Sequence, residues 1–162
     1  MVTPEVPKQK VPPPTTIGAL GVGDVFHRMV APQVYHFDRT GQFNEKFALV
    51  CVDFKALTEA EFKKGVRNAV EKSSFGLSSE LEWRRFEGRL FYVQGNFWGD
   101  NTQNRQEDYQ RLAKKIREID SRIGTEGNLL FYFGLPHFIY SQVTRELSAV
   151  GLLEPQRELS VA

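Results

Sequence analysis

A glycine-rich turn is the part of this sequence best suited to do chemistry. Gly21 and Gly23 are separated by one residue and followed by Asp24, directly after the predicted strand Thr15–Leu20. Glycines at this spacing match the start of the G-x-G-x-x-G turn, whose bare backbone contacts a pyrophosphate at a helix N-terminus. Phe26 stands at the third glycine position. The motif therefore also fits a strand-to-helix turn that binds no ligand.

Groups that act as catalysts or metal ligands are sparse. The histidines are His27, His36 and His137, and the first two lie on a predicted helix, where surface or core roles are the commonest. No Cys/His spacing suggests a zinc site, and no Ser/His/Asp grouping is evident. Acidic pairs such as Glu59 and Glu61 fit solvated helix faces. We assign no catalytic residue and no metal ligand.

The glycine turn must be positioned by the strand before it and the helix after it. We expect that helix over 24–36, with a kink at Pro32, which lacks an amide hydrogen. Thr58 and Glu61 have the spacing of a capping box and predict a helix start. Apolar runs and helical periodicity predict the remaining elements, which are strands at 47–53, 90–93 and 129–133, and helices at 79–86, 108–123 and 138–150, the last ended by Gly151.

Strands that alternate with helices predict the α/β class. We expect a Rossmann-like three-layer fold, a mostly parallel sheet of about four strands in the order 3-2-1-4, with helices on both faces. Five of the eight prolines precede residue 15 and predict an extended, poorly ordered arm over 1–14. The domain is expected to span 15–153, with a tail at 154–162.

Composition excludes several classes of protein. The chain has 162 residues, enough for one domain with a core, and a net charge of +1, which argues against nucleic-acid binding. No apolar stretch reaches the ~20 residues of a membrane span, and no signal peptide is evident. The single cysteine, Cys51, lies in an apolar run and predicts a buried thiol in a cytoplasmic protein.

The glycine turn and its helix resemble the cofactor domain of the glucose-6-phosphate dehydrogenase family. Its pattern here is G-A-S-G-D-L-x-x-R-K-L-x-P-A-L-Y, set without gaps against residues 20–35. The matching positions are Gly23, Asp24, Arg28, Pro32 and Tyr35. The first family glycine is Leu20, its serine is Val22 and its lysine is Met29. We expect these changes to weaken or abolish phosphate binding.

In a Rossmann site, residues at the end of the second strand contact the ribose of the adenosine. An acidic residue there favours NAD, and an arginine accommodates NADP. The family pattern V-G-x-A-R-x-x-L-T places Asp53 at the alanine and Phe54 at the arginine. We therefore expect NAD over NADP, although Lys55 offers a cation for NADP and Asp53 also fits a solvated loop residue.

The segment Asn128–Tyr140 is similar to the family pattern N-R-L-F-Y-L-A-L-P-P-x-x-Y. Pro136 and Tyr140 match, and His137 replaces the second proline. The resemblance implies that this turn flanks the cofactor and that His137 is the histidine nearest the nicotinamide. Together, the Rossmann turn, the end of the second strand and the resemblance predict a cofactor site that contains Gly21, Gly23, Asp24, Arg28, Asp53, Pro136 and Tyr140.

About twenty residues follow this segment, and nothing matches the family's catalytic R-I-D-H-Y-L-G-K motif. We expect the substrate domain to be missing and hydride transfer by this chain alone to be improbable. Three readings stay open: a dinucleotide-binding domain that works with a separate catalytic subunit, a non-catalytic interaction or regulatory module that has lost cofactor binding, and a truncated gene product. The strand Leu129–Phe133 would be an apolar sheet edge, which we expect a second copy, a partner subunit or the tail to cover.

Overall fold

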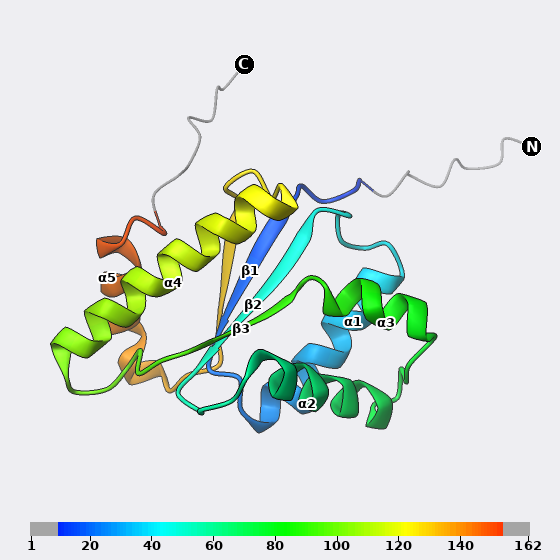
Figure 1. Cartoon of the computed structure of the whole chain (residues 1–162), viewed down its shortest axis with the longest axis horizontal. Coiled ribbons are helices and arrows are strands. Elements are labelled where there is room, and N and C mark those ends of the chain that lie inside the picture. The colour runs from blue at the N-terminus through cyan, green and yellow to red at the C-terminus, as the bar shows by residue number, and fades with distance from the viewer. Residues whose placement is uncertain (1–9, 154–162) are drawn as a thin grey trace, which may run out of the picture.

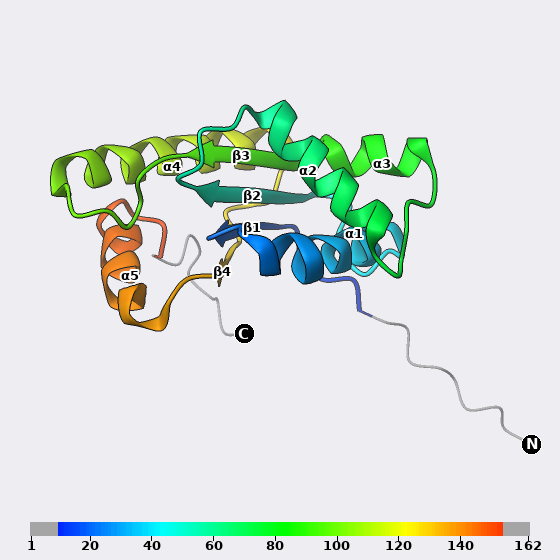
Figure 2. The same cartoon turned by 90° about the horizontal axis from the view of Figure 1, so that it is seen from below.

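A four-stranded parallel sheet forms the middle layer of this computed structural model, which describes residues 10–153 (Figures 1 and 2). The strands run side by side in the order β3-β2-β1-β4, and each neighbouring pair is parallel. Their bounds are β1 Thr15–Leu20, β2 Phe47–Asp53, β3 Leu90–Gln94 and β4 Leu129–Phe133. The predicted Rossmann-like α/β fold and the predicted strand order are both confirmed.

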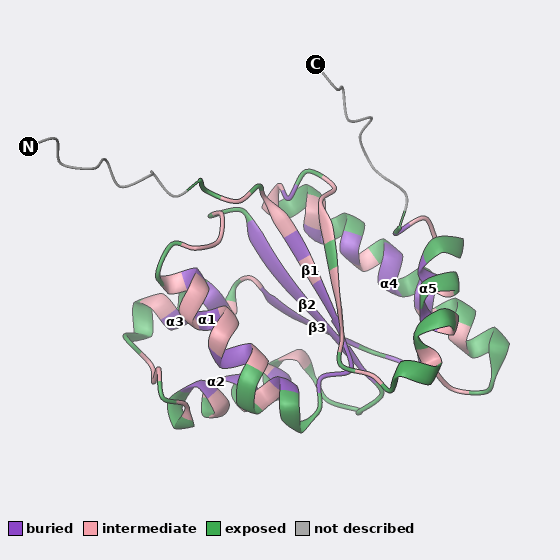
Figure 3. Cartoon of the chain, turned by 180° about the vertical axis from the view of Figure 1, so that it is seen from behind, coloured by how far each residue is buried: buried purple, intermediate pink, exposed green. Residues whose placement is uncertain are grey.

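Helices cover both faces of the sheet. On one face lie α1 Ala31–Arg39, α2 Glu59–Lys72 and α3 Glu80–Glu87, and on the other lie α4 Thr102–Ile123 and α5 Tyr140–Ala149 (Figure 1). Every residue of β2 is buried (Figure 3). Alternate β2 side chains enter two separate cores, Leu49 toward α1–α3 and Val50 toward α4 and α5. The continuous apolar run was therefore a correct signal of a strand covered on both faces.

The helix after the glycine turn starts with a π-helical segment, Phe26–Val30. There the Ala31 N–H donates to the Phe26 carbonyl, five residues back, and Pro32 then occupies the first turn of α1, where no amide hydrogen is needed. The irregularity expected at Pro32 thus takes the form of a π turn just before it. The helix ends at Arg39 rather than at His36.

Helix ends follow local side-chain chemistry. The Thr58 hydroxyl accepts from the Glu61 N–H, and the Glu61 carboxylate accepts from the Thr58 N–H at 2.7 Å, so the predicted capping box is confirmed. Gly151 has a φ of +75°, and its N–H donates to the Ser148 carbonyl, which confirms it as the residue that ends α5. The predicted start of α4 at 108 is wrong, because Asn101 caps the helix and α4 begins at Thr102.

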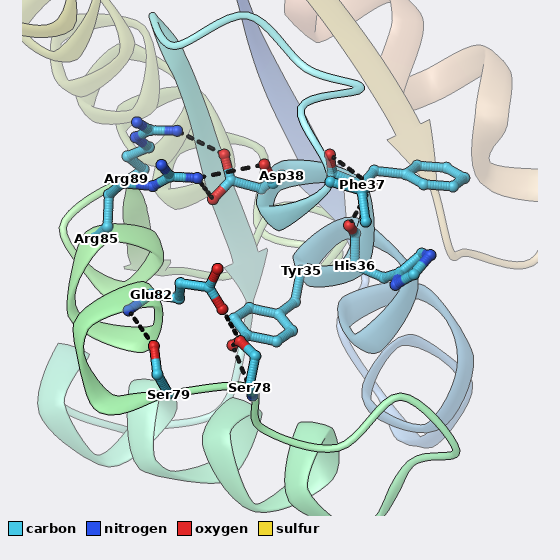
Figure 4. Close-up of polar contacts among 10 residues, drawn as sticks. Tyr35, His36, Phe37, Asp38, Ser78, Ser79, Glu82, Arg85 and Arg89 are labelled. Atoms are coloured by element: carbon cyan, nitrogen blue, oxygen red, sulfur yellow. Dashed lines mark hydrogen bonds and ion pairs between the residues drawn. The ribbon is translucent and has the colours of Figure 1, made fainter.

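A buried ion pair joins α1 to α3 and the turn after it (Figure 4). Asp38 near the end of α1 is 4% exposed, and Arg89 Nη1 lies 2.5 Å from its Oδ1. Arg85 approaches the same carboxylate at 3.8 Å. Burial raises the pKa of Asp38, and the two arginines only partly offset this rise. The pair therefore costs desolvation even as it connects the two elements.

The ends of the domain are described only in part. Residues 1–9 of the predicted arm and the whole predicted tail, 154–162, lie outside the described residues. Within residues 10–14, the Pro12 and Pro14 carbonyls accept hydrogen bonds from Asn44 and Asn128, so this part of the arm contacts the domain. Between residues 10 and 153, no helix is long and apolar enough to cross a bilayer.

Candidate functional site

A cleft of about 370 Å³ opens at the carboxyl edge of the sheet, between the turns that follow β1 and β4. We call it the turn cleft. Its lining comes from two segments far apart in the sequence: Gly21, Gly23, Asp24, Val25 and Phe26 after β1, and Tyr132–Leu135 at the end of β4. In the order β3-β2-β1-β4, the β1–β4 boundary is where the chain switches to the other side of β1. Open α/β sheets bind ligands at this switch point.

Gly21 and Gly23 play different structural roles in this cleft. Gly21 has a φ of +85°, and a Cβ built on it would lie 2.4 Å from the Gly134 carbonyl oxygen. The protein itself therefore requires glycine at this position. A Cβ on Gly23 would meet nothing within 4 Å. Packing within the protein therefore does not require glycine at this position. A bare backbone at Gly23 instead gives a ligand access to the turn from solvent.

Asp24, which lines the turn cleft, forms an ion pair with Arg28, which lies outside the lining. Arg28 Nη2 lies 2.7 Å from Asp24 Oδ2, and both side chains are exposed. Asp24 stands in the first turn of the helix, where the free backbone N–H groups and the helix dipole favour a negative charge. Its carboxylate therefore occupies the environment that would attract a phosphate, while Arg28 balances its charge.

Asp53 ends β2 and is not a solvated loop residue, so that alternative is wrong. It is 4% exposed, and its Oδ1 accepts a hydrogen bond from the Phe54 N–H at 2.7 Å. Burial, with a smaller contribution from the Asp53 charge, raises the pKa of Tyr92 to about 12. Phe54, at the arginine position of the family pattern, is exposed. The end of β2 thus presents a carboxylate beside an exposed aromatic ring.

The turn after β4 continues into a short 3-10 helix, His137–Ile139, and then α5. The Tyr140 hydroxyl lies 3.4 Å from the Phe133 carbonyl oxygen, and the two rings are 5.3 Å apart. Pro136 caps the 3-10 helix, and His137 is exposed beside Phe138. Residues 136–140 follow the lining residues Gly134 and Leu135 and do not themselves line the turn cleft.

The three family positions changed in the glycine turn differ in their surroundings. Leu20 is fully buried in the core beneath α4 and α5, and Val22 is buried in the opposite core. Both side chains point into the cores, so Leu20 does not obstruct the backbone of the turn. Met29 is exposed on the π-helical segment, so a lysine at this position would extend into solvent.

The structure brings together only part of the predicted site. Gly21, Gly23 and Asp24 line the turn cleft, whereas Arg28, Asp53, Pro136 and Tyr140 lie outside its lining. The lining residues missed include Tyr132, Phe133 and Gly134 at the end of β4. The sequence offered one signal for this part of the site, which is Gly134 directly before Leu135 and Pro136. No group of His, Cys, Asp or Glu suited to a metal ion occurs among residues 10–153.

Comparisons with known proteins identify the family of this chain. Residues 17–161 match the family described as glucose-6-phosphate dehydrogenase, NAD binding domain. The glucose-6-phosphate 1-dehydrogenase of Chlamydia muridarum is 31% identical over 142 residues, which cover 84% of this chain and 26% of that enzyme. Glucose-6-phosphate 1-dehydrogenase 2 of Mycobacterium bovis is 28% identical over 134 residues. The chain spans about a quarter of the length of these curated relatives.

Solved structures show the same fold. The crystal structure of glucose-6-phosphate 1-dehydrogenase from Mycobacterium avium superposes with a TM-score of 0.71 and 22% identity, covering 88% of this chain and 28% of that one. A glucose-6-phosphate dehydrogenase in complex with its substrate glucose-6-phosphate gives a TM-score of 0.72 at 21% identity. With a family match over residues 17–161, this chain belongs to the NAD binding domain family of glucose-6-phosphate dehydrogenase.

Proposed function

We propose that this chain binds a nicotinamide dinucleotide at the carboxyl edge of its sheet, with the pyrophosphate against the glycine turn. The observation that carries the proposal is the turn cleft at the switch point of the strand order. The open space around Gly23 gives a ligand access to the backbone. N–H groups at the start of the helix supply the hydrogen bonds that an anion needs.

We expect the chain to bind NAD on the order of tenfold more tightly than NADP. The reason is the buried Asp53 carboxylate at the end of β2, which accepts ribose hydroxyls but repels a 2′-phosphate. Phe54 supplies no cation to offset that repulsion. Calorimetric titration with NAD and NADP measures the ratio of the two affinities. Phe54→Arg is expected to lower this ratio, because the added cation favours the 2′-phosphate of NADP.

Phe54→Leu is the matched control, since it changes the same exposed side chain without adding charge and is expected to keep the preference for NAD. Tighter binding of NADP to the unaltered chain would contradict the roles of Asp53 and Phe54. The absence of heat with either cofactor at millimolar concentration would refute dinucleotide binding itself.

We further propose that this chain does not transfer hydride by itself. The family's reaction needs a histidine paired with an acid to remove the hydroxyl proton, and no segment of this sequence matches the motif that carries it. His137, which the resemblance implies is the histidine nearest the nicotinamide, lies on an exposed 3-10 helix. The proposed role of these residues is therefore to hold the cofactor for catalytic groups that they do not themselves supply.

A second candidate function is a protein interaction module that has lost cofactor binding. It is favoured by Met29 and Phe54, two exposed apolar side chains at positions where the family pattern has a lysine and an arginine. Exposed apolar groups stabilise contacts with proteins better than contacts with phosphates. Two results would favour this function over the first. Titrations with NAD and NADP would give no heat, and a protein partner would bind the unaltered chain but not the Met29→Lys and Phe54→Arg variants.

The free edge of β4 supports the proposal of a partner. In the described sheet β4 pairs only with β1, and Leu130 on it is 58% exposed. We expect a second copy, a partner subunit or residues 154–162 to cover this edge, because an open apolar strand promotes association. Hydrogen exchange should then be slow at the Leu129–Phe133 amides that point away from β1. A monomer by sedimentation whose outward amides exchange freely would contradict this expectation.

A further inference from the structure

The side chain of His27 binds the backbone of the glycine turn. Its Nδ1 lies 3.0 Å from the Gly23 carbonyl oxygen, and its backbone N–H donates to the same oxygen at 3.2 Å. Because a carbonyl oxygen can only accept a hydrogen bond, Nδ1 carries the proton in this contact. Two donors of one residue therefore fix one carbonyl group of the turn.

Packing against α2 holds the imidazole in place. The rings of Phe26 and Phe62 meet it at steep angles, with centroids 5.6 and 5.7 Å away. Gly65 of α2 presents only backbone to the ring, and a Cβ built there would lie 3.7 Å from His27 Nε2. Phe62 is itself buried and stacks on Tyr92 of β3 at 4.6 Å. The Nδ1–H donor is therefore anchored to the core and not only to its own helix.

Side-chain packing does not fix the backbone at Gly23. The residue is exposed, and a Cβ built on it would meet nothing within 4 Å. Glycine also has the widest choice of backbone angles. The orientation of the peptide group between Gly23 and Asp24 therefore depends on hydrogen bonds such as the two that His27 donates.

The direction of the Gly23 carbonyl decides where the next amide hydrogen points. This peptide bond is trans, so the Asp24 N–H points away from the Gly23 oxygen. With that oxygen bonded to His27 along the helix, the Asp24 N–H points out of the helix N-terminus, where an anion approaches. A flipped peptide would present the carbonyl oxygen there instead and would repel a phosphate.

We propose that His27 is a positioning residue of the dinucleotide site: its Nδ1–H holds the Gly23 carbonyl along the helix, so that the Asp24 N–H faces the pyrophosphate. The inference rests on the dinucleotide site proposed above and deepens it. In the family pattern G-A-S-G-D-L-x-x-R-K-L, His27 takes the second open position. The pattern thus specifies no residue type there, and the contact depends on this chain's own histidine.

Two variants of the full chain separate the donor of His27 from its ring. His27→Phe keeps an aromatic ring against Phe26 and Phe62 but has no donor, and its affinity for NAD in calorimetric titration is expected to fall about fivefold. His27→Asn loses the ring but keeps an N–H donor as many bonds from the backbone as Nδ1. It is expected to keep the affinity within about twofold. A purely structural role of the ring predicts the reverse order of the two variants.

The tautomer of His27 tests the contact in the unaltered chain. At mildly alkaline pH, where imidazole is neutral, nitrogen NMR of labelled histidine distinguishes a proton on Nδ1 from one on Nε2. We expect the His27 proton on Nδ1. His36 is the internal control: Arg39 Nη2, which can only donate, lies 3.4 Å from its Nδ1, so the His36 proton is expected on Nε2.

The outcomes distinguish this inference from the dinucleotide site on which it rests. Unchanged affinity for NAD in folded His27→Phe, verified by circular dichroism, would overturn the positioning role and leave the site intact. A neutral His27 protonated on Nε2 would also overturn it. No heat from NAD with the unaltered chain would instead refute the site itself. If either variant does not fold, the tautomer decides.

Discussion

Gly21→Ala is expected to lower the free energy of unfolding by about 3 kcal/mol. A φ of +85° costs an alanine roughly 1–2 kcal/mol that glycine does not pay. The Gly134 carbonyl oxygen, 2.4 Å from the new Cβ, adds the roughly 1–3 kcal/mol typical of overpacking, because backbone cannot rotate away as a flexible side chain can. Urea denaturation followed by circular dichroism measures the loss.

Gly23→Ala is the matched control for this prediction. It lies two residues along in the same turn, has no left-handed φ, and would place its Cβ in open space. Its effect on unfolding is expected to stay within about 0.5 kcal/mol. Equal losses from the two variants would contradict the assignment of Gly21 to the fold and Gly23 to the ligand.

The parts of the fold that the sequence predicted correctly depend on nearby residues. The apolar run of β2 needs only its own side chains to indicate burial on both faces. The capping box of Thr58 and Glu61 and the turn at Gly151 are likewise encoded within a few residues. Because these signals mark where elements begin and end, the strand order then followed from general rules of topology.

The sequence could not predict features that need two distant segments. Gly134 gives no local sign that Gly21 will touch it, since only the pairing of β4 with β1 brings the two together. The π turn before Pro32 is a similar case. A proline indicates that the helix is irregular, but it does not show whether the irregularity is a kink at the proline or a π turn before it. For the same reason the contribution of Tyr132 and Phe133 to the lining of the turn cleft was missed.

The departures from the family pattern fall into two physical groups. Leu20 and Val22 are buried on opposite faces of the sheet, so these apolar residues contribute to packing. Met29 and Phe54 are exposed and remove positions for cations at the edge where phosphates would bind. We expect only the second group to affect ligand affinity directly, so Met29→Lys and Phe54→Arg are the first substitutions to try for stronger binding.

Asp38→Ala is expected to destabilise the domain by about 3–5 kcal/mol, the range for removing one partner of a buried ion pair. Asp38 is 4% exposed, and the Arg89 side chain that it binds is 14% exposed. Without the carboxylate, Arg89 keeps a mostly buried charge that has lost this partner, and α1 loses its polar link to the turn after α3 (Figure 4). Chemical denaturation at neutral pH measures the change.

Asp24→Ala is the exposed counterpart, because its ion pair with Arg28 is solvated and such pairs contribute about 0–1 kcal/mol. A comparable loss from both variants would contradict the role of burial.

Asp38→Asn tests the charge of Asp38 separately from the hydrogen bond that it accepts from Arg89. Because burial raises the pKa of Asp38 above its ordinary value of 3.8 despite two nearby arginines, ionisation disfavours the fold. The stability linked to this group is fully present below pH 3.8 and falls as the pH rises through the raised pKa. Asparagine keeps an oxygen acceptor for Arg89 without that cost, so Asp38→Asn is expected to destabilise the domain much less than Asp38→Ala at neutral pH; equal losses would show that the charge, not the acceptor, stabilises this contact.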